Sequence, residues 1–145
     1  MFNRNNILLP IILILLAVVV AACNQRTTED TDVALPAKNS DGYTDITVDQ
    51  LAGMLESKDF TMVNVHIPYE GDLPQTDLSI PYNEIEANLS QLPASKDAQV
   101  VIYCRSDNMS TQAAETLVAL GYTNVIEVDG GMNAWENSGR ALLSR

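Results

Sequence analysis

The chain has 145 residues and is acidic, with 19 Asp and Glu against 8 Lys and Arg and a formal net charge of −11. This charge excludes nucleic acid as a partner, because the phosphate backbone would be repelled. One histidine and two cysteines, Cys23 and Cys104, are too few soft ligands for a zinc site, so we expect no metal.

The beginning of the chain indicates export. Residues 7–22 are apolar apart from one proline and follow a short polar start with one positive charge. The run is short for a membrane span and is typical of a secretory signal. It ends in VAAC at residues 20–23, which resembles the lipobox of bacterial lipoproteins. The resemblance implies a signal peptide over residues 1–22, a lipid on Cys23 and an extracytoplasmic chain anchored to a bacterial membrane. The alternative is an uncleaved anchor helix in which Cys23 is incidental.

A polar segment separates this start from the rest of the chain. Residues 23–42 are acidic and rich in Thr, Asp and Asn, without apolar periodicity. Such a segment cannot bury enough apolar surface to offset the entropy lost on ordering, so we predict a flexible tether. Residues 43–145 remain and are enough for one small domain.

The first half of this domain predicts a helix, a strand and a long loop. Thr47 and Gln50 match a capping box at the start of an apolar stripe with helical spacing. Residues 60–65 are rich in β-branched side chains and predict a strand, whereas residues 66–83 contain three prolines and predict a loop. Asn83 is placed to cap a short helix that ends before a proline.

The second half alternates strands and helices. Residues 98–104 are apolar apart from Gln99 and predict a strand buried on both faces. A helix is expected to begin near Ser110 or Thr111, followed by a strand over residues 124–128 and a last helix in which Trp135 packs into the core. This order predicts an α/β fold with a central, mostly parallel sheet.

The residue types at two strand ends point to chemistry. Cys104 ends one apolar strand, and His66 follows another. A loop that curls its N–H groups around the thiol, followed by a helix N-terminus, would stabilise a nucleophilic thiolate. The alternative is a buried, inert cysteine. For His66 the alternatives are a support for that thiolate and a loop histidine bonded to the backbone.

Several motifs resemble one family. The sequence YCRSDNMS at residues 103–110, with LGYTNVIEVDGGMNAW at 120–135, resembles the second half of a rhodanese-like domain. ITVDQLAGML at residues 46–55 and VNVHIPYEGDLPQTDLSIPYNEI at 63–85 extend the resemblance over nearly the whole domain. It implies a single α/β domain whose active-site cysteine loop lies between a strand and a helix.

The resemblance also implies an activity, sulfur transfer without a cofactor. Cys104 would be the catalytic residue, taking sulfane sulfur from a small donor such as thiosulfate as a persulfide. It would pass the sulfur to cyanide or to a thiol, including a protein thiol. The residues that would bind the donor are those of the loop: Arg105, Ser106, Asp107, Asn108, Met109 and Ser110.

The loop departs from the family pattern. Asp107 stands where relatives often have glycine, and Asn108 and Met109 stand where relatives have arginine, so Arg105 is the one positive charge left between residues 104 and 110. A carboxylate beside a thiolate disfavours the thiolate and repels anionic donors. Asp107 would also be strained if the loop requires positive φ. Alternatively both side chains point to solvent and only the backbone matters.

Two further functions compete with sulfur transfer. Asp107 and Asn108 favour a low-activity or inactive rhodanese-like module for thiol and redox sensing or partner binding. Cysteine phosphatases use a related loop in which an arginine grips phosphate six residues after the cysteine. Ser110 occupies that place here, which argues against a phosphatase.

Overall fold

The computed structural model describes residues 34–144. The predicted signal peptide and the lipidated Cys23 lie outside these residues and stay predictions. Among residues 34–144, no helix combines the length and the apolar character that crossing a membrane requires.

A single parallel sheet organises the domain. Its strands are β1 (Thr44–Ile46), β2 (Thr61–Asn64), β3 (Leu78–Ser79), β4 (Val100–Tyr103) and β5 (Val125–Val128). They lie in the order β1-β5-β4-β2-β3, and every neighbouring pair is parallel. The predicted α/β class with a central parallel sheet is therefore confirmed.

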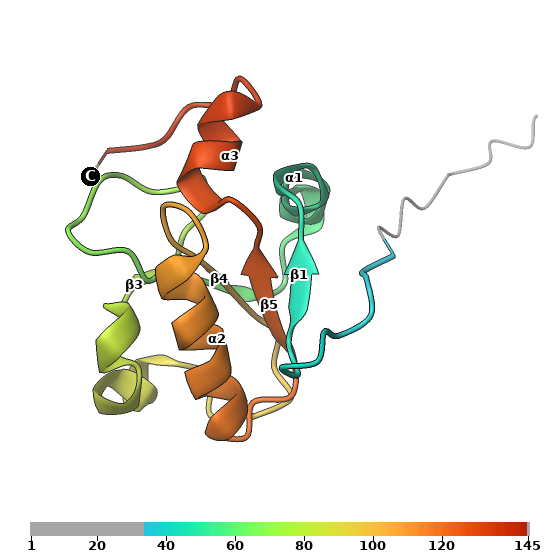
Figure 1. Ribbon diagram of the computed structural model, residues 1–145, viewed down its shortest axis with the longest axis vertical. Coiled ribbons are helices and arrows are strands. Elements are labelled where there is room, and N and C mark those ends of the chain that lie inside the picture. Colours follow the sequence, from blue (N-terminus) through green and yellow to red (C-terminus); the bar gives the residue numbers. More distant parts are fainter. Residues whose placement is uncertain (1–33, 145) are drawn as a thin grey trace, which may run out of the picture. The chain divides into compact units, whose positions relative to one another are not determined.

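Helices flank this sheet. The α-helices are α1 (Val48–Met54), α2 (Asn108–Ala119) and α3 (Gly131–Asn137), and short 3₁₀ segments span Leu55–Ser57, Tyr82–Glu84 and Glu86–Gln91. Figure 1 shows α1 and α3 near each other and apart from α2. The predicted capping box is confirmed, because the Thr47 hydroxyl accepts the Gln50 N–H at 3.2 Å and the Gln50 side chain accepts the Thr47 N–H at 2.9 Å.

Two hydrophobic cores cover the two faces of the sheet. On β4 the side chains alternate between them, as successive residues of a strand must. Ile102 and the following Cys104 belong to the core under α2, whereas Val101 and Tyr103 belong to the core under α1 and α3. All four residues of β4 are buried, which confirms the prediction for this strand. Trp135 is buried in the second core, also as predicted.

Two short strands, β1 and β3, were not predicted from the sequence. β1 has three residues and β3 has two, so neither is long enough to show the two-residue alternation of a strand. β1 exists because it pairs with β5, and β3, inside the predicted loop, exists because it pairs with β2. Both are strands through tertiary pairing rather than local propensity.

Two predicted helix starts were wrong. Asn83 lies inside the first of two 3₁₀ segments that follow Pro81, so it caps nothing. α2 begins at Asn108, before Ser110, which places Ser110 within the first turn of the helix. The helix starts early because Asp107 turns the chain sharply, with φ 90° and ψ −42°.

The end of the predicted tether contacts the domain. The Lys38 ammonium donates to the carbonyl of Thr123, and the Asn39 side chain donates to the Asp45 carboxylate at 2.9 Å. The ordered domain therefore begins a few residues before residue 43.

Candidate active site

Cys104 follows β4 directly and lies just beneath an exposed loop. Only 2% of its surface is exposed, and it is a free thiol. Its Sγ lies 3.4 Å from the backbone nitrogen of Ser106 and 3.2 Å from the hydroxyl of Ser110, so both groups are placed to donate to it. Hydrogen bonds from such donors stabilise negative charge on an acceptor, which is the charge that a nucleophilic sulfur carries.

The start of α3 holds the loop from its other side. The Met132 N–H donates to the Cys104 carbonyl, and the Asn133 N–H donates to the Arg105 carbonyl, both at 3.0 Å. This approach requires Gly131, which has φ +48°, because a Cβ there would lie 2.2 Å from the Cys104 carbonyl oxygen. Gly131, the first residue of α3, is thus a packing requirement of the cysteine loop.

Asp107 adopts a strained backbone and uses its side chain within the fold. Its φ of 90° confirms that the loop requires positive φ at this position. Its carboxylate accepts the N–H of Gly130, while no side chain caps α2 within the described residues. The interpretation that this side chain only points to solvent is therefore wrong. Its carbonyl oxygen accepts the Thr111 N–H at 2.8 Å and lies 3.0 Å from the Ser110 hydroxyl oxygen.

The two positions after Asp107 bring no positive charge to the loop. Asn108 is exposed, and its side-chain oxygen accepts from Gln112 at 2.8 Å along the helix. Met109 is half-buried and packs against the core that contains Cys104. Neither residue replaces the arginines that the family often has.

The remaining cation of the loop is paired. Arg105 forms an ion pair with Glu70, and the same carboxylate oxygen lies 3.0 Å from Nε2 of His66. The hydrogen bond from Arg105, assisted by that from His66, lowers the pKa of Glu70 from its ordinary value. His66 therefore contacts Glu70 and not the Cys104 sulfur. Its backbone N–H donates to the Asn64 side chain at 2.9 Å, and its Nδ1 is buried without a partner.

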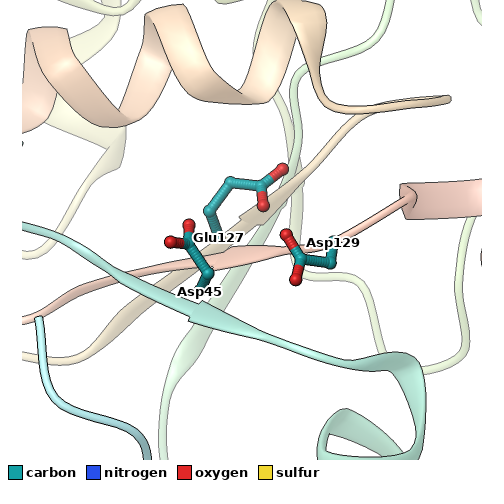
Figure 2. Close-up of side chains that lie close together, drawn as sticks. All are labelled: Asp45, Glu127 and Asp129. Carbon is teal, nitrogen blue, oxygen red and sulfur yellow. The ribbon is translucent and has the colours of Figure 1, made fainter. Parts of the chain in front are cut away.

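A buried carboxyl group lies behind the loop. Glu127 on β5 is 2% exposed, and its Oε1 lies at hydrogen-bond distance from the Ser110 hydroxyl oxygen, 2.5 Å away. Asp45, its register partner on β1, and Asp129 bring their carboxylates to the same place, with one oxygen of each residue within 4.8 Å of the others. Figure 2 shows the three side chains close together, Asp45 from β1, Glu127 from β5 and Asp129 from the chain just after β5.

Burial and repulsion between the carboxylates raise the pKa values of Glu127 and Asp129. Burial raises the pKa of Glu127 to about 8, with further increases from Asp107, Asp129 and Asp45, while the Ser110 hydrogen bond opposes them. Burial, then Asp45 and Asp107, also raise the pKa of Asp129. A protonated carboxyl among acidic neighbours accounts for the cluster, and we assign no metal to it.

Sequence reasoning missed Glu127. The signal was present, because Glu127 is the one charged residue in the apolar stretch NVIEV at residues 124–128. A charge in a strand buried on both faces requires a partner or a proton. What the sequence did not show is that this partner is Ser110.

Comparisons with known proteins agree with this geometry. Residues 47–138 match the rhodanese-like domain family, and the chain belongs to that family. A sulfurtransferase of Allochromatium vinosum is 34% identical over 94 residues, which are 63% of this chain and 85% of that protein. Thiosulfate sulfurtransferase PspE of Escherichia coli is 30% identical over 70 residues, 47% of this chain and 67% of that protein.

A solved structure confirms the fold. The crystal structure of a rhodanese-like domain protein from Staphylococcus aureus is similar to this chain with a TM-score of 0.57 and 34% sequence identity. The similarity covers 69% of this chain and 98% of the other.

Proposed function

We propose that this protein is a sulfurtransferase that moves sulfane sulfur from a small donor such as thiosulfate through a persulfide on Cys104. The observation that carries the proposal is the buried Sγ at the end of β4, with two hydrogen-bond donors directed at it. Membership of the rhodanese-like family supports the reaction class. The name of the Escherichia coli relative supports thiosulfate as the donor.

The first half of the reaction loads the sulfur. The Cys104 thiolate attacks the outer sulfur of thiosulfate, a new S–S bond forms, and the S–S bond of the donor breaks. Sulfite leaves with the electron pair of that bond, so the total charge is unchanged and no external oxidant is needed. The N–H of Ser106 and the hydroxyl of Ser110 hold the attacking sulfur as an anion.

The second half unloads it. A nucleophilic acceptor, cyanide or a thiolate, attacks the outer sulfur of the persulfide. The S–S bond breaks, its electron pair returns to Cys104 as the thiolate, and thiocyanate or an acceptor persulfide leaves. Both steps are displacements at sulfur in which the electrons balance, so the reaction as proposed needs no redox cofactor.

The test uses the soluble domain. We expect the wild-type chain to form thiocyanate from thiosulfate and cyanide, and intact-mass spectrometry to show one added sulfur atom after thiosulfate alone. Cys104→Ala should do neither. If wild type and Cys104→Ala behave alike in both measurements, the proposal of sulfur transfer through Cys104 is wrong.

We also propose that the protein is anchored to a bacterial membrane, outside the cytoplasm, by a lipid on Cys23. The proposal is supported by the apolar run that ends in VAAC at residues 20–23. Cells fed an alkyne analogue of palmitate should label the full-length chain, and Cys23→Ala should remove the label. Undiminished labelling of Cys23→Ala would refute the anchor.

A second candidate function is a rhodanese-like module for thiol sensing or partner binding with little turnover. It is favoured by the pairing of Arg105 with Glu70, which occupies the loop cation that an anionic donor would use. In this case the Cys104 thiolate would attack a disulfide of the partner and form a mixed disulfide, releasing the other partner sulfur as a thiolate, yet thiosulfate would leave the mass of the chain unchanged. The intact-mass measurement therefore separates the two functions.

A further inference from the structure

We propose that Glu127 is a positioning residue: its carboxyl proton directs the Ser110 hydroxyl toward the Cys104 sulfur and so keeps that sulfur reactive. The proposal deepens the proposed function, because it depends on Cys104 acting as a nucleophile. It concerns the sulfur before any donor binds, so it can be tested without sulfur transfer.

The three groups form a buried hydrogen-bond chain. Ser110 Oγ lies 2.5 Å from Glu127 Oε1 and 3.2 Å from Cys104 Sγ, and all three residues are at least 98% buried. They come from three different elements: β5, the first turn of α2 and the end of β4. These contacts run directly from Glu127 to Ser110 and from Ser110 to Cys104, without a charged side chain of the exposed loop.

Which group donates in each of these hydrogen bonds depends on the carboxyl proton of Glu127. A serine hydroxyl has a single hydrogen to donate and two lone pairs that accept. When Glu127 carries a proton, it donates to Ser110 Oγ, and the hydroxyl hydrogen is left for the two remaining acceptors, the Cys104 sulfur at 3.2 Å and the Asp107 carbonyl at 3.0 Å. When Glu127 is ionised, its carboxylate attracts the hydroxyl hydrogen, and the sulfur loses a donor and faces a buried negative charge.

The surroundings of Glu127 favour the protonated form. The charged groups that act on it are acidic on each side: Asp45 on β1, Asp129 after the end of β5, and Asp107 before α2. On β4 its register partner is the apolar Ile102, and the Cys104 thiol is linked to Glu127 through Ser110. With its pKa near 8, Glu127 holds its proton at neutral pH.

The first experiment measures the rate at which iodoacetamide, a neutral reagent, alkylates Cys104 between pH 6 and 10. Glu127→Gln cannot ionise but can still donate to Ser110. We expect Glu127→Gln to lower by about one unit the pH at which the alkylation rate reaches half its maximum. The rise of the rate with pH should also become sharper, because two coupled titrations become one. Glu115→Gln, an exposed residue on α2, is the matched control and should leave the profile unchanged.

Ser110→Ala tests whether the effect passes through the hydroxyl. We expect it to slow alkylation several-fold at pH 8, because the thiolate loses a charge-assisted hydrogen bond. In the Ser110→Ala background, Glu127→Gln should shift the profile by less than half as much. An unchanged profile of Glu127→Gln, or an equal shift with and without Ser110, would overturn the proposal.

A second measurement covers the case in which Glu127→Gln does not fold. Carbon-13 NMR of the Glu127 carboxyl follows its titration directly in the wild-type chain and in Cys104→Ala. Because the coupling of two titrating groups is reciprocal, the Glu127 midpoint should fall when the thiol is removed. A midpoint that does not move would refute the coupling, and neither result depends on a sulfur donor or acceptor.

Discussion

The carboxylate of Asp107 accepts a hydrogen bond from the backbone N–H of Gly130, 23 residues further along the chain. The contact ties the cysteine loop to the glycine pair that begins α3 and compensates for the positive φ of Asp107, a conformation that costs a non-glycine residue roughly 1–2 kcal/mol. It also leaves a negative charge at the rim of the loop. The same residue therefore stabilises the loop and disfavours anionic reagents there.

The first prediction concerns this charge. Asp107→Gly combined with Asn108→Arg removes a carboxylate and adds a guanidinium beside the loop. We expect the rate constant for loading sulfur from thiosulfate to rise roughly tenfold, equivalent to about 1.4 kcal/mol, because the donor is an anion. Stopped-flow or quenched intact-mass measurements would give this rate.

A matched pair of reagents isolates the electrostatic part. Iodoacetate and iodoacetamide react with a thiolate in the same way, but only iodoacetate is charged. The double variant should raise the ratio of the iodoacetate rate to the iodoacetamide rate. If this ratio stays constant or falls, repulsion by Asp107 is not what limits anionic reagents.

The second prediction concerns the pairing of Arg105 with Glu70. Glu70→Gln releases the guanidinium to bind an anionic donor. We expect KM for thiosulfate to fall by roughly two- to fivefold with little change in kcat, the scale of an exposed ion pair. Steady-state kinetics at low and high salt would measure this, and the effect should be smaller at high salt.

The control for Glu70→Gln is Glu56→Gln. Glu56 is exposed and lies in the 3₁₀ segment that leads into β2, near the amino ends of the strands and away from the cysteine loop. Glu56→Gln changes the net charge of the protein by the same amount as Glu70→Gln. Equal effects of the two variants would show that overall charge, and not the release of Arg105, controls donor binding.

The third prediction concerns Gly131. Gly131→Ala places a Cβ 2.2 Å from the Cys104 carbonyl oxygen, so the loop and α3 must separate. We expect the free energy of unfolding to fall by roughly 2–4 kcal/mol, measured by urea denaturation.

Gly139→Ala separates crowding from backbone strain. Gly139 has φ +84°, but a Cβ there would have no atom within 4 Å. Gly139→Ala should therefore lower the free energy of unfolding only by the strain of positive φ, about 1–2 kcal/mol. If Gly131→Ala is no more destabilising than Gly139→Ala, the close contact with Cys104 is not a constraint.

The fourth prediction concerns stability and pH. Burial raises the pKa of Glu127 from 4.5 to about 8, so between these values the folded chain keeps a proton that the unfolded chain has lost. Its contribution to stability is fully present below about pH 4.5 and is lost as the pH rises through 8. The unfolding free energy of wild type minus that of Glu127→Gln should therefore fall by at most about 1.4 kcal/mol per pH unit.

Urea denaturation of both variants from pH 5 to pH 9 gives this difference. Subtraction removes the pH dependence that the other acidic groups share. A difference that stays constant, or that grows with pH, would show that Glu127 does not keep a proton in the folded state.

Local patterns in the sequence were enough for much of this protein. The capping box of Thr47, the continuously buried strand before Cys104 and the alternation of elements depend on neighbours a few residues apart, so they predicted the α/β class and the position of the thiol. The motifs around that thiol indicated the family. The predictions of an export signal and of a lipid on Cys23 also depend on local sequence alone.

The tertiary structure decided which distant residues meet the thiol and its loop. Parallel pairing of β1 with β5 gathers Asp45 and Glu127 under α2, and the early start of α2 turns Ser110 toward both Glu127 and the sulfur. Arg105 contacts Glu70 across 35 residues. No periodicity encodes such contacts, because they arise from the order of strands in the sheet and not from the spacing of residues along the chain.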